Sequence, residues 1–204
     1  MAVRSEITPI RQVLIHTPGS EHNYTLPKNT TEWVADESGK LIHNPDYLLF
    51  DDIISPAGMA AEHNELENVL TAFTGKDHTY QFHDLLVDTL QTPAQRQELY
   101  SACSSLDQKL YGTENSVDTQ KIMDLEAVDF AAVLLSGRIT KPVLETVFKW
   151  PLPNLIFTRD IAVTLNNALI LTWGRWPARQ REMLLMKHVA HHHPLFSSFT
   201  QFDF

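Results

Sequence analysis

The stretch Pro151–Asp160 constrains the fold of this chain more than any other segment. Pro151 and Pro153 fix their own φ angles and push the residues before them out of the α region, so the sequence predicts a rigid, extended entry. Leu155-Ile156-Phe157 then has the composition of a short buried strand. Thr158-Arg159-Asp160 follows and places opposite charges directly beside that strand.

Asp160 is the first candidate functional residue. A buried carboxylate costs too much free energy unless a partner neutralises it. Asp160 therefore either pairs within the protein, for example with its neighbour Arg159, or receives a cationic ligand. On these residues alone, an internal ion pair at a strand end and a ligand site both remain open.

The composition excludes several classes of function. The 204 residues suffice for one large domain or two small ones, and 43% hydrophobic and 20% charged residues are ordinary for a soluble globular protein. The formal net charge of −9 argues against non-specific nucleic-acid binding and against anionic membranes as partners. The same charge is compatible with a cationic small-molecule substrate.

Cysteine usage and the lack of targeting signals indicate a cytoplasmic protein. The single cysteine, Cys103, excludes an intrachain disulfide framework and fits a reducing compartment. The first residues, Met-Ala-Val-Arg-Ser-Glu, contain no apolar signal-peptide core. No apolar run approaches the length of a membrane span, so we expect no membrane association.

The first part of the chain predicts one α/β unit. Arg11–His16 is a β-branched run that ends in the turn signal Thr17-Pro18-Gly19-Ser20, and Thr79–Phe82 predicts a second strand. Between them, 21–44 predicts a loop with short strands. The segment 60–73 predicts a helix that ends at a glycine. Its apolar stripe consists of Ala61, Leu66, Val69, Leu70 and Phe73.

The segment 84–149 predicts helices almost throughout. Thr92-Pro93 has the pattern of a helix start, and Gly112 and Gly137 have the pattern of helix ends. Three apolar stripes recur at helical spacing. They are Leu99, Cys103, Leu106 and Leu110; then Leu125, Val128, Ala132 and Leu135; and last Val143, Leu144, Val147 and Phe148. Within the first stripe, Cys103 has the position of a small core residue rather than of a nucleophile.

After Asp160 the sequence predicts a β-hairpin and then a helix. Two apolar runs, 161–165 and 168–172, flank Asn166-Asn167, which is a turn signal. An aromatic and basic loop, 173–179, follows them. A partly amphipathic helix is expected to begin near Arg181.

The run His191-His192-His193 does not predict a metal site, because consecutive residues of a regular helix or strand cannot all point at one ion. The tail 197–204 alternates like a strand up to the last residue. A natural domain seldom ends within such a pattern, so we expect the chain to be truncated.

Several motifs together resemble those of the arginine deiminases. They are Pro153–Asp160, the run Trp176-Pro177-Ala178-Arg179-Gln180-Arg181-Glu182, and His192-His193-Pro194. The Arg11–His16 strand with its turn, and Leu48-Leu49-Phe50-Asp51-Asp52, resemble the opening of that family. The resemblance extends over the whole chain in the same order, and it corresponds to the N-terminal portion of the family.

This resemblance implies a five-bladed α/β propeller, the pentein fold, with an inserted helical bundle. It divides the chain into a first propeller module at 1–83, the helical bundle at 84–149 and the start of a second module at 150–204. In such enzymes a cysteine attacks the guanidinium carbon of arginine, ammonia leaves, and water releases citrulline from the thiouronium intermediate. The resemblance implies neither a metal nor an organic cofactor.

The resemblance also implies roles for four residues. Asp160 matches the catalytic carboxylate that binds the guanidinium nitrogens, and Asn154 and Phe157 match positions that line the arginine pocket. Arg179 matches the residue that holds the α-carboxylate of the substrate. Carboxylates and guanidinium groups suit one another as planar, bidentate partners, so we expect Asp160 and Arg179 to lie apart, at opposite ends of the bound amino acid.

The family pattern also has parts that this sequence lacks. Its late cysteine in a Gly-rich loop, its His-x-Asp motif and a further acid are absent from these 204 residues. A thiol nucleophile and a proton carrier are both required for this reaction. We therefore expect this chain alone to be inactive, either as the N-terminal part of a longer hydrolase or as a degenerate relative.

Two other functions stay open. One is a related enzyme, such as an amidinotransferase or a hydrolase of another guanidino compound. The other is a non-catalytic protein that binds arginine or a partner through its helical bundle. Exposed apolar strand edges also favour self-association, so a homo-oligomer is possible.

Overall fold

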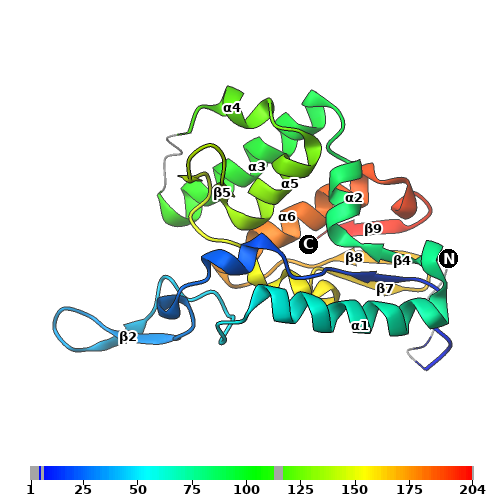
Figure 1. Ribbon diagram of the computed structural model, residues 1–204, viewed down its shortest axis with the longest axis horizontal. Coiled ribbons are helices and arrows are strands. Elements are labelled where there is room, and N and C mark those ends of the chain that lie inside the picture. Colours follow the sequence, from blue (N-terminus) through cyan, green and yellow to red (C-terminus); the bar gives the residue numbers. More distant parts are fainter. Residues whose placement is uncertain (1–4, 6, 113–116, 204) are drawn as a thin grey trace.

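A computed structural model of the chain describes residue 5, residues 7–112 and residues 117–203. Helices and short strands alternate along these residues, which confirms the predicted α/β class. Figure 1 shows β4, β7, β8 and β9 in the middle of the molecule, with α1 along one side of them and the remaining helices on the other. The predicted helical segment contains residues 113–116, which lie outside the described residues.

The first strand pair is parallel, as an α/β unit requires. Strand β1 (Val13–Ile15) pairs with β4 (Thr79–Gln81), and the connection between them contains helix α1 (Pro56–Thr74). The Ser55 hydroxyl accepts a hydrogen bond from the backbone N–H of Gly58, and Pro56 occupies the first helical turn. Both are standard devices for starting a helix.

Helix α1 is confirmed, but its apolar stripe is largely exposed. Leu66 is 49% exposed, Val69 55% and Phe73 76%, whereas the buried residue of this helix is His63. Spacing alone therefore predicted the helix correctly, although most of the stripe is not covered by the described part of the chain.

The predicted loop 21–44 contains an antiparallel hairpin that projects from the molecule (Figure 1). Its strands are β2 (Trp33–Ala35) and β3 (Leu41–His43). The ring of His43 stacks on Trp176 with centroids 4.8 Å apart. The hairpin therefore contacts the start of the last helix.

The predicted helices between 84 and 137 are confirmed where the structure describes them. They are α2 (Phe82–Asp88), α3 (Pro93–Tyr111), α4 (Thr119–Met123) and α5 (Ala127–Ser136). The Thr92 hydroxyl accepts a hydrogen bond from the N–H of Gln95 at the start of α3. Gly112 and Gly137 end α3 and α5 in the left-handed conformation.

The last predicted helical stripe, 143–148, was wrong. This segment forms a short antiparallel pair, β5 (Arg138–Ile139) with β6 (Glu145–Thr146). The backbone N–H groups of Val147 and Phe148 both donate to the carbonyl of Gly137. Those tertiary hydrogen bonds replace the ones that a helix would form.

The predicted hairpin after Asp160 is confirmed and belongs to a three-stranded sheet. Strand β7 (Ala162–Leu165) pairs antiparallel with β8 (Ala168–Leu171), and β8 pairs in parallel with β9 (Thr200–Asp203). Helix α6 (Pro177–His192) connects β8 with β9.

The strand predicted at Leu155-Ile156-Phe157 was wrong. Pro153–Ile156 forms a 3-10 turn, in which the N–H of Phe157 donates to the carbonyl of Asn154. Proline suits the first position of such a turn because it has no N–H to satisfy. A second 3-10 turn, Thr158–Asp160, leads directly into β7.

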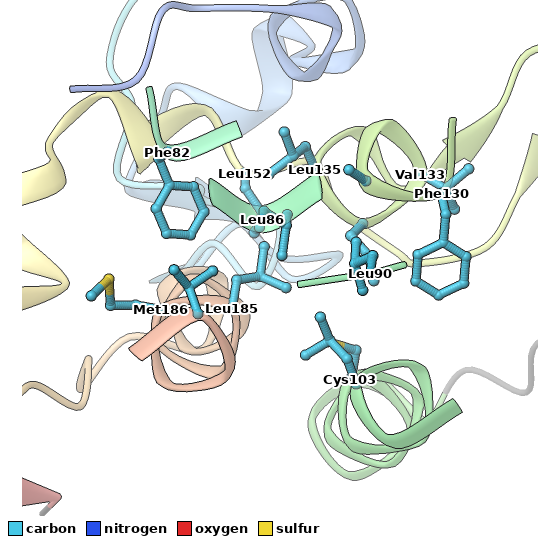
Figure 2. Packing of buried hydrophobic residues seen from close by; sticks show 14 of the residues in the cluster. Phe82, Leu86, Leu90, Cys103, Phe130, Val133, Leu135, Leu152, Leu185 and Met186 are labelled. Atoms are coloured by element: carbon cyan, nitrogen blue, oxygen red, sulfur yellow. The ribbon is translucent and has the colours of Figure 1, made fainter. Parts of the chain in front are cut away.

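One hydrophobic core joins the helices to α6. Figure 2 shows Leu86 of α2 and Leu185 of α6 in the middle of this core, with Phe82 of α2 at one side and Phe130 of α5 at the other. Cys103 of α3 belongs to the same core and is fully buried, which confirms its predicted place. Burial raises the pKa of its thiol to about 12, so this cysteine is a poor nucleophile.

The strands of the described residues form four separate small sheets and no closed barrel or propeller. Among these residues, no helix combines the length and the apolar composition that crossing a membrane requires.

Candidate functional site

The candidate site lies where helix α6 begins. Pro177 occupies the first turn of this helix, after Trp176, and the backbone N–H of Arg179 donates to the carbonyl of Trp176. The aromatic stack between Trp176 and His43 fixes this end of the helix against the β2–β3 hairpin. Arg179 therefore projects from a rigid first turn.

Arg179 is held by two carboxylates. Its Nη1 donates to Asp160 Oδ2 at 2.7 Å, and its Nε and Nη2 donate to Glu182 Oε2 at 3.0 and 2.8 Å. Nη2 also donates to the backbone carbonyl of Asn154 at 3.3 Å. Burial opposes the charge of Arg179, but Glu182 and Asp160 together keep its pKa above the usual value.

Glu182 is the buried partner of Arg179 in this cluster. Its side chain is fully buried, one turn along α6 from Arg179. Burial raises the pKa of Glu182 to about 7, although Arg179 acts in the opposite direction. Within the described residues, its Oε1 atom is buried without a hydrogen-bond partner. Burial and the neighbouring guanidinium thus act on the pKa of this carboxylate in opposite directions.

Asp160 differs from Glu182 in its exposure. Its side chain is 51% exposed, so one face of the carboxylate is open to solvent. The backbone is fixed on both sides: the N–H of Asp160 donates to the Phe157 carbonyl, and its own carbonyl accepts the Thr172 hydroxyl at 2.5 Å. The acid is therefore both held in position and accessible.

Asn154 and Phe157 flank the cluster in different ways. Asn154 is buried, and its side-chain amide donates to the carbonyl of Leu48 at 2.5 Å. This bond joins the site to the Leu48–Asp52 segment, which the sequence also singled out. Phe157 is half-exposed, and its backbone carbonyl accepts the N–H of Asp160.

The expected separation of Asp160 and Arg179 was wrong for this structure. The two side chains form a direct ion pair instead of lying at opposite ends of a ligand. The structure thus brings Asp160, Arg179 and the Asn154 backbone into one hydrogen-bonded cluster. The Asn154 amide and the Phe157 ring lie at its margin.

Sequence reasoning missed Glu182 as a member of this cluster. Residues three apart on a helix are neighbours, and an Arg–Glu pair at that spacing is a recognisable signal once the helix start is known. We expected the helix to begin near Arg181, which placed Arg179 in the preceding loop. Since α6 begins at Pro177, both residues lie on one helical face.

The hydrogen-bond count of Arg179 limits what it can bind. A guanidinium has five N–H donors, and the four bonds described above engage both Nη2 donors, the Nε donor and one Nη1 donor. A single Nη1 donor therefore remains for a ligand while the cluster is intact. A bidentate contact with a ligand carboxylate requires Arg179 to release Asp160.

Two cavities lie near these elements. One of about 510 Å³ is mainly apolar and is lined by residues of β1, β7, β8 and α6, together with Thr158 and Arg159. The other, of about 430 Å³, contains the buried pair His16 and Glu21, whose Nε2 and Oε1 atoms are 3.2 Å apart. Neither Asp160 nor Arg179 is among the described residues that line these two cavities.

The fold and this cluster define a mixed α/β protein with a guanidinium–carboxylate site. The family model for arginine deiminase matches residues 46–203, a range that contains the whole cluster. The chain belongs to the arginine deiminase family, which confirms the resemblance inferred from its motifs.

Individual relatives agree with this assignment. The chain is 26% identical over 212 residues to a protein named arginine deiminase from Limosilactobacillus fermentum, covering 96% of this chain and 47% of the relative. It is also 26% identical over 207 residues to arginine deiminases of Staphylococcus aureus strains JH9 and Mu3, covering 95% of this chain and 46% of each relative. The chain thus spans about half the length of these relatives.

Proposed function

We propose that this chain supplies arginine-binding residues of an arginine deiminase-like hydrolase, which converts L-arginine and water into L-citrulline and ammonia. The observation that supports this proposal most directly is the half-exposed carboxylate of Asp160, which already binds a guanidinium group. Its place in the range matched by the arginine deiminase family adds support.

In this proposal, the guanidinium of the substrate takes the place of Arg179 on the Asp160 carboxylate. Arg179 remains anchored by Glu182 and turns its released Nη1 donors toward the α-carboxylate of the substrate. The exchange replaces one charge-assisted contact by another, so it costs little electrostatic energy. Phe157 offers its exposed ring to the apolar part of the substrate.

The segment that Asn154 holds adds a second kind of support. Leu49 lies beside the carbonyl that accepts the Asn154 amide, and it has a φ of 59°, which is unfavourable for a leucine. Such strain persists only where surrounding contacts enforce it, and it is concentrated at ligand sites. We propose that this turn borders the arginine pocket.

The nucleophile of the proposed reaction is not Cys103. This thiol is fully buried in the helical core, and burial raises its pKa to about 12. We propose that the catalytic cysteine and histidine belong to parts of a longer protein, whose strands complete a five-bladed propeller with the small sheets described above. A cytoplasmic location and self-association belong to the same proposal, and light scattering tests the latter.

Arginine binding by this chain tests the proposal through Asp160→Asn, which removes the charge but keeps the shape. Asp77→Asn is a matched control, because Asp77 also lies in an exposed 3-10 turn that leads directly into a strand. We expect Asp160→Asn to weaken L-arginine binding in calorimetry by about 10–100-fold, since a charged hydrogen bond contributes about 1.5–3 kcal/mol. The control should bind like the original chain.

Agmatine, which is arginine without its α-carboxylate, tests the role of Arg179. It should bind more weakly than arginine to the original chain, and Arg179→Met should abolish that preference. Equal arginine binding by the Asp160→Asn variant and the original chain would remove Asp160 from the site. Citrulline formation by this chain alone would contradict the predicted lack of a nucleophile.

A further inference from the structure

A second cluster of titratable side chains lies at the other end of α6. His188 and His192 are four residues apart on this helix, so both project from one face toward α3, where Glu98 meets them. One potential ligand atom from each of the three residues lies within 4.8 Å of the other two. This cluster takes no part in the proposed arginine site.

His188 carries the strongest sign of a ligand. The residue is only 5% exposed, and its Nε2 atom is buried without a hydrogen-bond partner among the described residues. The ring also lies close enough to the backbone of Thr89 to be influenced by it electrostatically. A buried imidazole nitrogen without a partner is a potential metal-ligand atom.

The other two residues complete a set of three donors. His192 Nε2 and Glu98 Oε2 are 3.4 Å apart, which is close to the ligand separation around a tetrahedral zinc ion with bonds of about 2.1 Å. The rings of His188 and His192 have centroids 4.4 Å apart.

We propose that Glu98, His188 and His192 bind one divalent transition-metal ion, with zinc as the best match. Two imidazoles and one carboxylate suit zinc, and water fills the fourth position. Magnesium and calcium prefer all-oxygen ligands, which this cluster does not offer. The two histidines have the same helical spacing as those of helical zinc sites.

This site differs from the one that the sequence argued against. The three consecutive histidines 191–193 do not bind one ion together, because their side chains have different surroundings. His192 faces Glu98, whereas His193 Nε2 lies 3.4 Å from Asp88 on α2. Only the middle histidine of the run joins the cluster, and its metal-binding partner is His188.

An ion in this position connects two parts of the fold. Glu98 belongs to the helical region, and α6 also carries the arginine-binding cluster at its first turn. Because the ion binds the folded arrangement and not the unfolded chain, it stabilises the contact between α3 and α6. We infer a structural role for the metal rather than a catalytic one.

Zinc binding to the chelator-treated chain tests the proposal. We expect one zinc ion per chain in calorimetry, and a Tm increase of about 5–10 °C when free zinc is one hundred times Kd. Glu98→Ala and His192→Ala should each weaken zinc binding by at least about tenfold. Both residues are exposed, so these variants should fold.

Two matched controls separate this site from ordinary surface binding. His191→Ala removes an exposed neighbour of His192, and Asp88→Ala removes the carboxylate of the other histidine pair. Both variants should bind zinc like the original chain. Losses in His191→Ala equal to those in His192→Ala would assign the binding to the histidine run and overturn the proposal.

Cobalt(II), which occupies zinc sites and absorbs visible light, provides an independent readout. Nitrogen and oxygen ligands predict four-coordinate bands without a thiolate charge-transfer band. A thiolate band would place the metal at Cys103 and overturn the proposal, as would zinc binding that Glu98→Ala leaves unchanged.

Discussion

Both ends of helix α6 have a buried titratable side chain, but in the part of the chain that the structure describes only the one at the first end is paired with a cation. At the first end, the fully buried Glu182 binds Arg179, which in turn binds the half-exposed Asp160. At the last end, the buried His188 faces two exposed groups, but its Nε2 atom has no hydrogen-bond partner among the described residues. Each end thus combines one buried titratable group with exposed partners.

The difference between the ends is the presence of a permanent cation. Arg179 supplies the positive charge at the first end, so a ligand must compete with it for Asp160. The last end offers two imidazoles and one carboxylate whose potential ligand atoms lie within 4.8 Å of one another, and we propose that a metal ion binds between them. Under the two proposals, ligand binding at the first end requires Arg179 to release Asp160, whereas metal binding at the last end requires no such exchange.

Arg181 lies between the two ends, and its removal should have the largest effect on stability. It is 5% exposed and donates to the carbonyls of Leu134 and Trp150, while its Nη1 lies 3.7 Å from Asp107. Arg181→Met removes a buried cation that lies beside the buried carboxylate of Asp107. We expect a loss of about 3–5 kcal/mol in the free energy of unfolding, measured with urea.

Arg175→Met is the control for Arg181→Met, because Arg175 is exposed in the loop before the same helix. It should change the free energy of unfolding by less than about 0.5 kcal/mol. Equal losses in the two variants would show that the stability of the chain does not depend on the buried arginine of α6.

Glu182→Gln should change the pH dependence of stability. The pKa of Glu182 is raised to about 7 in the folded chain, above its unfolded value of about 4.5. Between these values the folded state holds a proton that the unfolded state has lost, so this group makes stability fall as pH rises. Relative to the original chain, the variant should gain about 3 kcal/mol between pH 4.5 and pH 7.

Because His188 also makes the free energy of unfolding depend on pH, the effect of Glu182→Gln must be measured as the difference between the variant and the original chain. The pKa of His188 is lowered to about 4 by burial, so its contribution rises with pH over part of the same window. Urea unfolding at several pH values, with the original chain subtracted from the variant, cancels the His188 contribution. A difference that stays constant from pH 4.5 to pH 7 would show that Glu182 titrates normally.

The elements that the sequence predicted well are those with local start and end signals. Thr92-Pro93 and Gly112 bounded α3 correctly because caps depend on neighbouring residues. The segment 143–148 has helical spacing, yet Val147 and Phe148 bond to the Gly137 carbonyl, which no local pattern reveals. The exposed stripe of α1 shows the same limit, because spacing does not report what covers a face.

The candidate site could also be predicted only in part, because local motifs identify residues but do not reveal their tertiary contacts. Asp160 and Arg179 were identified by motif, but their direct pairing depends on how the turn Thr158–Asp160 lies relative to the start of α6. Glu98 and His188 are far apart in sequence and meet only because α3 contacts α6. The sequence shows that both residues are potential metal ligands, but it does not show that they lie close together.

The smallest expected effect compares two similar side-chain pairs at the last end of α6. Glu98–His192 and Asp88–His193 are both carboxylate–histidine pairs at 3.4 Å, and their carboxylates are 63% and 65% exposed. Exposed pairs of this kind contribute about 0–1 kcal/mol, so Glu98→Ala and Asp88→Ala should be nearly equal in stability with a chelator present. Adding zinc should separate them, because it should stabilise only the variant that keeps Glu98. A loss above about 2 kcal/mol for Glu98→Ala in the metal-free chain would instead show that Glu98 already satisfies His188, and the last end of α6 would then be closed like the first.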